Sequence, residues 1–69
     1  MTLGEKILNE RKKKKLTQNE LSIKSGVAVR TIKAIENNEI SSFTFGTIGR
    51  IAWVLGLSLD ELWKISMNI

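Results

Sequence analysis

The 69-residue sequence predicts a single all-α domain of five short helices. Three observations indicate this fold class. Apolar residues recur at the three- and four-residue spacing of a helix face, the strict alternation of a half-buried strand is missing, and single glycines or capping residues separate the apolar stretches. Proline, linkers, repeats and low-complexity tracts are also absent, so we place one domain over residues 1–69.

The first helix is expected over about Leu3–Lys14. Leu3 and Ile7 lie on its core side, and Arg11 continues the same stripe four residues later. The helix ends in four consecutive lysines at positions 12–15. These lysines either stabilise the carbonyl end of the helix dipole or, for one or two of them, contact a phosphate backbone.

The second helix is expected over about Gln18–Ser25. Thr17 caps it, Glu20 completes the capping box T-x-x-E, and Leu21 faces inward one turn later. Gly26 then breaks the helix.

The third helix is expected over about Val29–Asn37, and Val27 is buried just before it. Ile32 and Ile35 face the core, which leaves four side chains turned outward or to the flank: Val29, Arg30, Lys33 and Ala34. Two helices joined by a glycine turn, with a mostly polar outer face, are the signature of a helix-turn-helix motif.

The fourth helix is expected to begin after Thr44 as its cap and to end at Gly56. Its core face contains Phe45, Ile48, Ile51, Ala52 and Leu55. Ser58 then caps a fifth helix, where Glu61 completes a second S-x-x-E box and Leu59 and Leu62 point inward.

Composition narrows the classes of function. Eleven Lys and Arg against seven Asp and Glu leave a net charge of +4, which suits a polyanionic partner. The chain has no Cys and no His, which excludes zinc sites of the usual ligand types, cysteine nucleophiles and histidine acid-base chemistry. It also lacks a Gly-rich phosphate loop, so we expect no metal site, no cofactor, no catalytic residues and no enzymatic activity. No apolar stretch approaches the roughly 20 residues that cross a bilayer, so we expect a cytoplasmic protein without a membrane partner.

The motifs together resemble the Cro/cI-type family, whose fold is the lambda-repressor-like DNA-binding domain. The resemblance lies in Arg11, LTQNELS from Leu16, SGV from Ser25, TIKAIEN from Thr31 and IAWVLGLSLDEL from Ile51. It implies double-stranded DNA binding and an ion pair between Arg11 and Glu36. Three positions depart from the family pattern: Ala28, Asn38 and Phe43 replace the usual capping Ser or Thr, a Gly and a Pro.

The resemblance also implies which residues contact DNA: Gln18, Val29, Arg30, Thr31, Lys33, Ala34 and Asn37. Arg30 is the best base reader, because a guanidinium can donate two parallel hydrogen bonds to guanine. The alternative for Arg30 is a phosphate contact or a solvated side chain. Gln18 is expected to bind a phosphate, although a simple exposed amide is the alternative. Asn37 and Asn38 either contact phosphate or supply a left-handed helix end.

The expected function is therefore regulation of transcription by a homodimer that binds an operator and acts as a repressor or autoregulator. Trp53 and the apolar C-terminal end are the candidate dimer contacts, although Trp63 and Ile65 could instead cover the core of one chain. Two alternatives remain: an antitoxin that binds a toxin protein and autoregulates its operon, and an interaction module without DNA binding.

Overall fold

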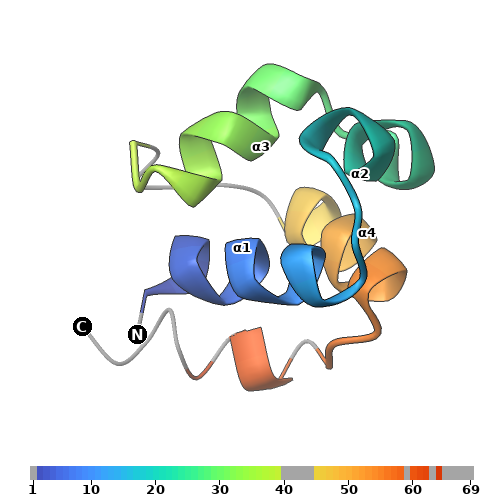
Figure 1. Cartoon of the computed structure of the whole chain (residues 1–69). Coiled ribbons are helices and arrows are strands. Elements are labelled where there is room, and N and C mark those ends of the chain that lie inside the picture. Colours follow the sequence, from blue (N-terminus) through green and yellow to red (C-terminus); the bar gives the residue numbers. More distant parts are fainter. Residues whose placement is uncertain (1, 40–44, 59, 63, 65–69) are drawn as a thin grey trace.

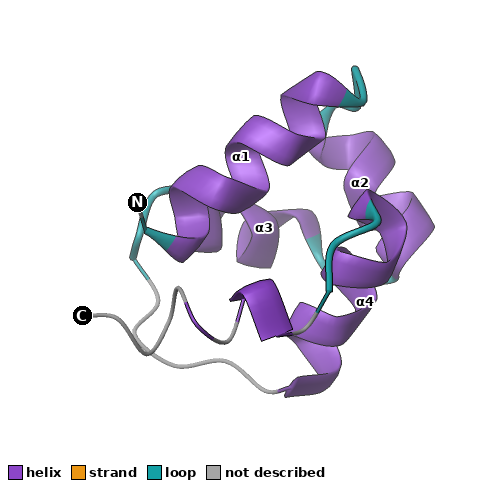
Figure 2. Cartoon of the chain, turned by 90° about the horizontal axis from the view of Figure 1, so that it is seen from below, coloured by secondary structure: helices purple, strands orange, loops and turns teal. Residues whose placement is uncertain are grey.

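The computed structural model describes residues 2–39, 45–58, 60–62 and 64, and it is helical throughout its regular parts (Figure 1). The labelled helices are α1 (Leu3–Lys13), α2 (Gln18–Ser25), α3 (Val29–Glu36) and α4 (Phe45–Leu55). Residues 60–62 and 64 are also helical, where the fifth helix was predicted. Figure 2 shows helices and loops, and no strand, in the described part of the chain. The all-α prediction is confirmed.

The helix boundaries agree with the predictions to within one residue. α1 ends at Lys13 and α3 at Glu36, each one residue earlier than expected. In both cases a residue with positive φ follows two positions later, Lys15 and Asn38, each at 57°. This left-handed conformation stops a helix. The predicted cap of α4, Thr44, lies outside the described residues.

Side chains at the helix starts satisfy backbone N–H groups that have no partner inside the helix. The Thr17 hydroxyl accepts from the Glu20 N–H at 3.0 Å, and the Glu20 carboxylate accepts from the Thr17 N–H at 2.8 Å. These hydrogen bonds, led by the one from the Thr17 backbone, lower the pKa of Glu20. The same box joins Thr2 and Glu5 at the start of α1, where the sequence T-x-x-E had been overlooked.

The core lies where the helices meet, since α1 and α2 each contact both α3 and α4. It contains every core residue that was predicted and whose side chain the structure describes: Leu3, Ile7, Leu21, Val27, Ile32, Ile35, Ile48, Ile51, Ala52, Leu55 and Leu62. Leu62 brings the fifth helical segment under α1 (Figure 1), where Lys6 Nζ lies 3.9 Å from a Glu61 carboxylate oxygen. The Ser58 hydroxyl accepts from the Glu61 N–H at 3.1 Å, as the predicted cap requires. The predicted core residue Leu59 and the side chain of Phe45 are not among those described.

One close backbone approach sets the distance between α1 and α3. Gly4 is buried, and a Cβ atom built there would collide with the carbonyl oxygen of Ile35 and lie 2.8 Å from Oδ1 of Asn38. Real Cβ atoms essentially never come that close to another atom. Only glycine therefore allows the first turn of α1 to pack against the end of α3.

Candidate nucleic-acid interface

The turn between α2 and α3 is held by hydrogen bonds as well as by its glycine. Gly26 has a φ of 74°, which glycine adopts without strain. The Ser22 hydroxyl donates to the carbonyl oxygen of Val27 at 2.6 Å, and the Val27 N–H donates to the Ser25 hydroxyl at 3.2 Å. Val27 is itself buried in the core. These contacts fix the direction in which α3 leaves the turn, and the two serines had not been singled out from the sequence.

The inner face of α3 packs on the rest of the domain. Ile32 and Ile35 are buried in the core, and Glu36 is buried beside them. The three residues follow helical spacing, so they define the side of α3 that no ligand can reach. This arrangement confirms the predicted inward face.

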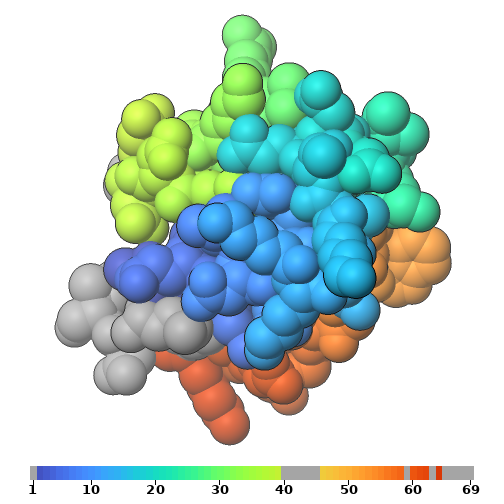
Figure 3. Space-filling view, viewed as in Figure 1, coloured from blue at the N-terminus to red at the C-terminus, as the bar shows by residue number. Residues whose placement is uncertain are grey.

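The outer face of α3 presents the predicted DNA-contacting side chains. Arg30, Lys33 and Asn37 are exposed, and three further predicted contacts are half-buried at the flanks: Val29, Thr31 and Ala34. Figure 3 shows atoms of the α3 segment projecting at the upper edge of the molecule. Arg30 and Lys33 form no ion pair with any described residue. The two cationic groups are thus open to an external anion.

The N-terminus of α3 differs from those of α1 and α2. Ala28 occupies the N-cap position with φ −57° and ψ 140°, and no side chain there accepts from the backbone. The carbonyl oxygen of Ala28 still accepts from Thr31 and Ile32 at 3.0 and 3.1 Å. The helix therefore starts at the expected residue without the hydroxyl that usually caps it.

The predicted ion pair between Arg11 and Glu36 is present, and a third residue forms a hydrogen bond to it. Arg11 donates to both carboxylate oxygens of Glu36, from Nε at 2.8 Å and from Nη2 at 3.1 Å, while its Nη1 donates to the carbonyl of Leu16 at 2.8 Å. The side chains are only 11% and 3% exposed. In a bidentate pair with so little exposure to solvent, each partner compensates the charge of the other inside the fold.

Gln18 is the third residue, and its side-chain amide forms a hydrogen bond inside the protein. Its Nε2 donates to Oε1 of Glu36 at 2.8 Å, so one amide N–H is committed inside the protein. Gln18 is half-buried rather than a simple exposed amide. The amide still has a second N–H, and Gln18 and Asn19 lie in the first turn of α2, where backbone N–H groups lack helical partners.

The four lysines at positions 12–15 are all exposed, but they differ in whether they form an ion pair. Lys13 Nζ lies 3.1 Å from a carboxylate oxygen of Glu10, and Lys6 lies 3.7 Å from the same oxygen. Hydrogen bonding to Lys13 lowers the pKa of Glu10, so this carboxylate is charged and offsets part of the lysine charge. Lys12 has no ion pair with a described residue, which makes it a better candidate than Lys13 for a phosphate contact.

In the part of the chain that the structure describes, these basic groups are accompanied by neither a metal-binding cluster nor a membrane-spanning helix. Among the described residues, no cluster of three or more carboxylate, imidazole or thiol side chains could hold a metal ion. None of the described helices has the length and apolar character needed to span a bilayer.

Comparison with known proteins relates the chain to a helix-turn-helix family. A family model described as helix-turn-helix, of the Cro/cI type, matches residues 7–62. This segment begins within α1 and includes the complete α2-turn-α3 unit, α4 and the buried Leu62. Searches of the curated proteins and of the solved structures find no match. The matched segment covers most of the chain, which therefore belongs to the Cro/cI-type helix-turn-helix family of DNA-binding transcriptional regulators.

Proposed function

We propose that the chain binds a specific double-stranded operator as a homodimer and represses or autoregulates transcription. The observation that carries this proposal is the outer face of α3, where Arg30 and Lys33 are exposed and form no ion pair with a described residue. A helix of this kind fits the major groove of B-form DNA, with its side chains directed at base edges.

Each side chain on the outer face and flanks of α3 has a distinct task in this proposal. Arg30 donates two hydrogen bonds to O6 and N7 of a guanine, whereas Lys33 adds a less directional charge. Thr31 donates or accepts one hydrogen bond at the flank. Val29 and Ala34 have no polar atoms beyond the backbone, so they pack on thymine methyl groups or leave room for the duplex. Sequence preference then depends on few base contacts and partly on DNA shape.

Gln18 and Asn37 position the helix instead of reading bases. Gln18 approaches a phosphate with its remaining amide N–H and with the backbone N–H groups at the start of α2. Its hydrogen bond to Glu36 holds the amide in one orientation, which lowers the entropy lost on binding. Asn37 lies just past the end of α3 and is exposed there.

A dimer would place two copies of α3 in successive major grooves on one side of the duplex, roughly 34 Å apart. Its mass should be visible by analytical ultracentrifugation at micromolar concentrations. Of the two candidate dimer contacts, Trp53 is 81% exposed and accessible to a second copy, whereas the apolar C-terminal residues lie outside the described residues.

Selection of bound fragments from random duplex DNA tests the function directly. We expect an enriched palindrome whose half-sites are separated by about one helical turn, and a guanine that Arg30→Ala no longer selects. Lys64→Ala is the matched control, since it removes an exposed cation from a segment far from α3 in the sequence. Retention of fragments without any shared sequence would contradict the proposal.

The antitoxin alternative is favoured by one observation, the exposure of two large apolar side chains. Ile23 is 82% exposed and Trp53 is 81% exposed, and exposed apolar surface can serve a protein partner. A toxin-like reading frame next to the gene, and a stable complex of the two products, would favour this alternative over a regulator that acts alone.

A further inference from the structure

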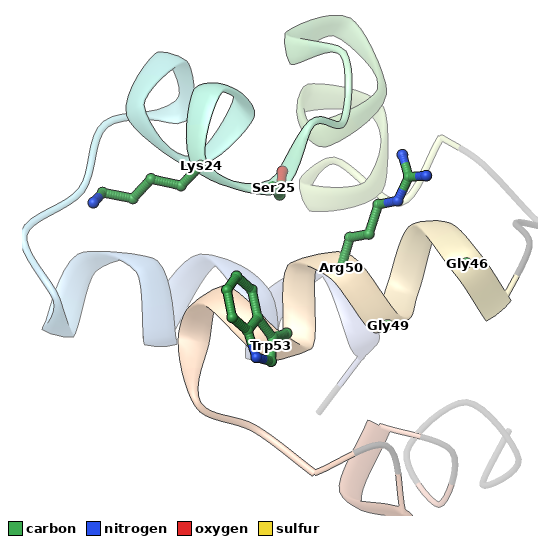
Figure 4. Close-up of a pocket in the computed structure, with 6 residues that line it drawn as sticks. All are labelled: Lys24, Ser25, Gly46, Gly49, Arg50 and Trp53. Carbon is green, nitrogen blue, oxygen red and sulfur yellow. The ribbon is translucent and has the colours of Figure 1, made fainter.

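A second surface lies away from the outer face of α3, in a shallow groove between α2 and α4 (Figure 4). The end of α2 contributes Lys24 and Ser25, and α4 contributes Gly46, Gly49, Arg50 and Trp53. No residue of α3 lines the groove. The groove therefore shares no lining residue with the proposed base-reading surface, although Arg50 Nη1 reaches the α2–α3 turn, 3.9 Å from a Cβ atom built at Gly26.

The groove results from the order of residues along α4. Gly46, Gly49, Arg50 and Trp53 follow the three- and four-residue spacing of one helix face. The two glycines add no side chain to that face, whereas Trp53 stands at one end and is 81% exposed. The result is a flat floor beside a large, rigid aromatic ring.

The charge of the groove has one sign. Lys24 and Arg50 are both exposed, neither forms an ion pair with a described residue, and no carboxylate lines the groove. In Figure 4, Arg50 and Trp53 project from α4 and Lys24 from α2. The Lys24 ammonium and the Arg50 guanidinium point away from each other in this view, with the Trp53 ring between them, so a ligand that contacts all three would have to extend along the groove.

We propose that this groove binds an acidic segment of another protein that also carries an apolar side chain. Arg50 would hold a carboxylate with two parallel hydrogen bonds, and Lys24 would add a second attractive charge. The apolar side chain would cover the face of Trp53 above the glycine floor. Tryptophan and arginine are the residues that most often dominate the binding energy of protein interfaces.

Two other occupants fit the groove less well. A second copy of this chain, paired through a two-fold axis, would place cations against cations, because every charged side chain that lines the groove is positive. A DNA duplex presents its charged backbone to such a surface and keeps its bases stacked inside, so it would satisfy Lys24 and Arg50 but give Trp53 little to contact.

The test is a selection of random twelve-residue peptides on the full chain, followed by fluorescence anisotropy with the enriched peptide. We expect peptides rich in Asp and Glu with at least one aromatic or aliphatic residue. Trp53→Ser, and separately Lys24→Glu or Arg50→Glu, should each weaken binding by about tenfold or more. All three side chains are exposed, so these variants should fold like the parent, which circular dichroism checks.

Two matched controls lie outside the groove. Ile23→Ser removes an apolar side chain as exposed as Trp53, and Lys12→Glu reverses an exposed lysine on α1. Both should leave peptide affinity within about twofold of the parent, because neither side chain lines the groove. Equal losses in the controls and the groove variants would overturn the proposal.

Three further results would also overturn it. One is that no peptide is enriched on the parent chain relative to the Trp53→Ser variant. Another is that Trp53→Ser converts a dimer into a monomer in the ultracentrifuge, which would make the groove a contact between copies. The third is that the groove variants lose affinity for duplex DNA with a reduced salt dependence. The proposal does not rest on operator binding, so failure of the DNA selection leaves the peptide result interpretable.

Discussion

The inner and outer faces of α3 use charged side chains for opposite purposes. Glu36 on the inner face is 3% exposed and accepts hydrogen bonds from Arg11 and Gln18. Arg30 and Lys33 on the outer face are exposed and pair with no described carboxylate. A buried charge must be compensated inside the chain, whereas an exposed charge without a partner is available to a ligand. Burial and pairing, more than residue type, therefore separate the structural charges from the functional ones.

The largest expected effect comes from breaking the inner pair. Arg11→Met and Glu36→Gln should each lower the free energy of unfolding by roughly 3–5 kcal/mol, because each leaves its partner uncompensated in a buried site. The double variant should lose less than the sum of the two. Guanidinium chloride denaturation, followed by circular dichroism, measures the free energy of unfolding of the two single variants and the double variant.

The exposed pair of Lys13 with Glu10 is the matched control for this cycle. Lys13→Met should cost less than about 1 kcal/mol, because solvent screens a surface ion pair. Strict additivity of Arg11→Met and Glu36→Gln would contradict the coupling.

Gly4→Ala tests the inner face through its shape instead of its charge. The added methyl group would collide with the Ile35 carbonyl and force α1 away from α3, at a cost of roughly 1–3 kcal/mol of stability. Gly46→Ala in α4 is the control, since that glycine is exposed and alanine there should gain up to about 1 kcal/mol. Thermal melting compares the stability of both variants with that of the parent. An unchanged melting temperature for Gly4→Ala would refute the close packing of α1 against α3.

Arg30→Ala tests the outer face and should leave stability nearly unchanged. It should remove roughly 1–3 kcal/mol of discrimination at one base position in each half-site, because no other base pair offers the same bidentate contact. Lys12→Ala should instead weaken binding to all sequences and flatten the slope of log affinity against log salt by about 0.9 for one lost phosphate contact.

Titrations of operator and scrambled duplexes at several salt concentrations separate these two outcomes. If Arg30→Ala weakens both duplexes equally and preserves the base preferences, Arg30 contacts phosphate. The sequence specificity would then come from Thr31, Lys33 or DNA shape.

The smallest effect is expected at the start of α3. Ala28→Ser should raise the free energy of unfolding by about 1 kcal/mol, because a serine hydroxyl can accept from a first-turn N–H that Ala28 leaves uncapped. Base preferences should stay the same, since the change lies at the helix end. Chemical denaturation compares the two proteins, and an unaltered midpoint would show that the hydroxyl does not reach the helix.

The helices and the core could be predicted from local spacing. The boundaries of α2 followed from Thr17, Glu20 and Gly26, because capping boxes and left-handed glycines act within a few residues of one helix end. The core positions followed from the periodicity of 3.6 residues, which depends only on which side of a helix is apolar. The capping box at Thr2 has the same signature and was missed although the sequence contains it.

The contacts between helices could not be predicted from spacing alone. Arg11 and Glu36 are 25 residues apart in the sequence, and their pairing was inferred only through the family resemblance. Nothing local indicated that Gln18 would join them, that Gly4 would touch Ile35, or that α2 and α4 would leave a groove.

The sequence by itself therefore determined the helices, their caps, the buried stripes and the basic outer face of α3. Only the tertiary structure decided which charges cancel, as in Arg11 and Glu36, and which surfaces stay open, as at Trp53. The physical reason is that helix formation depends on residues three or four positions apart. Side-chain pairing and surface shape depend on how helices distant in the sequence come to lie against one another.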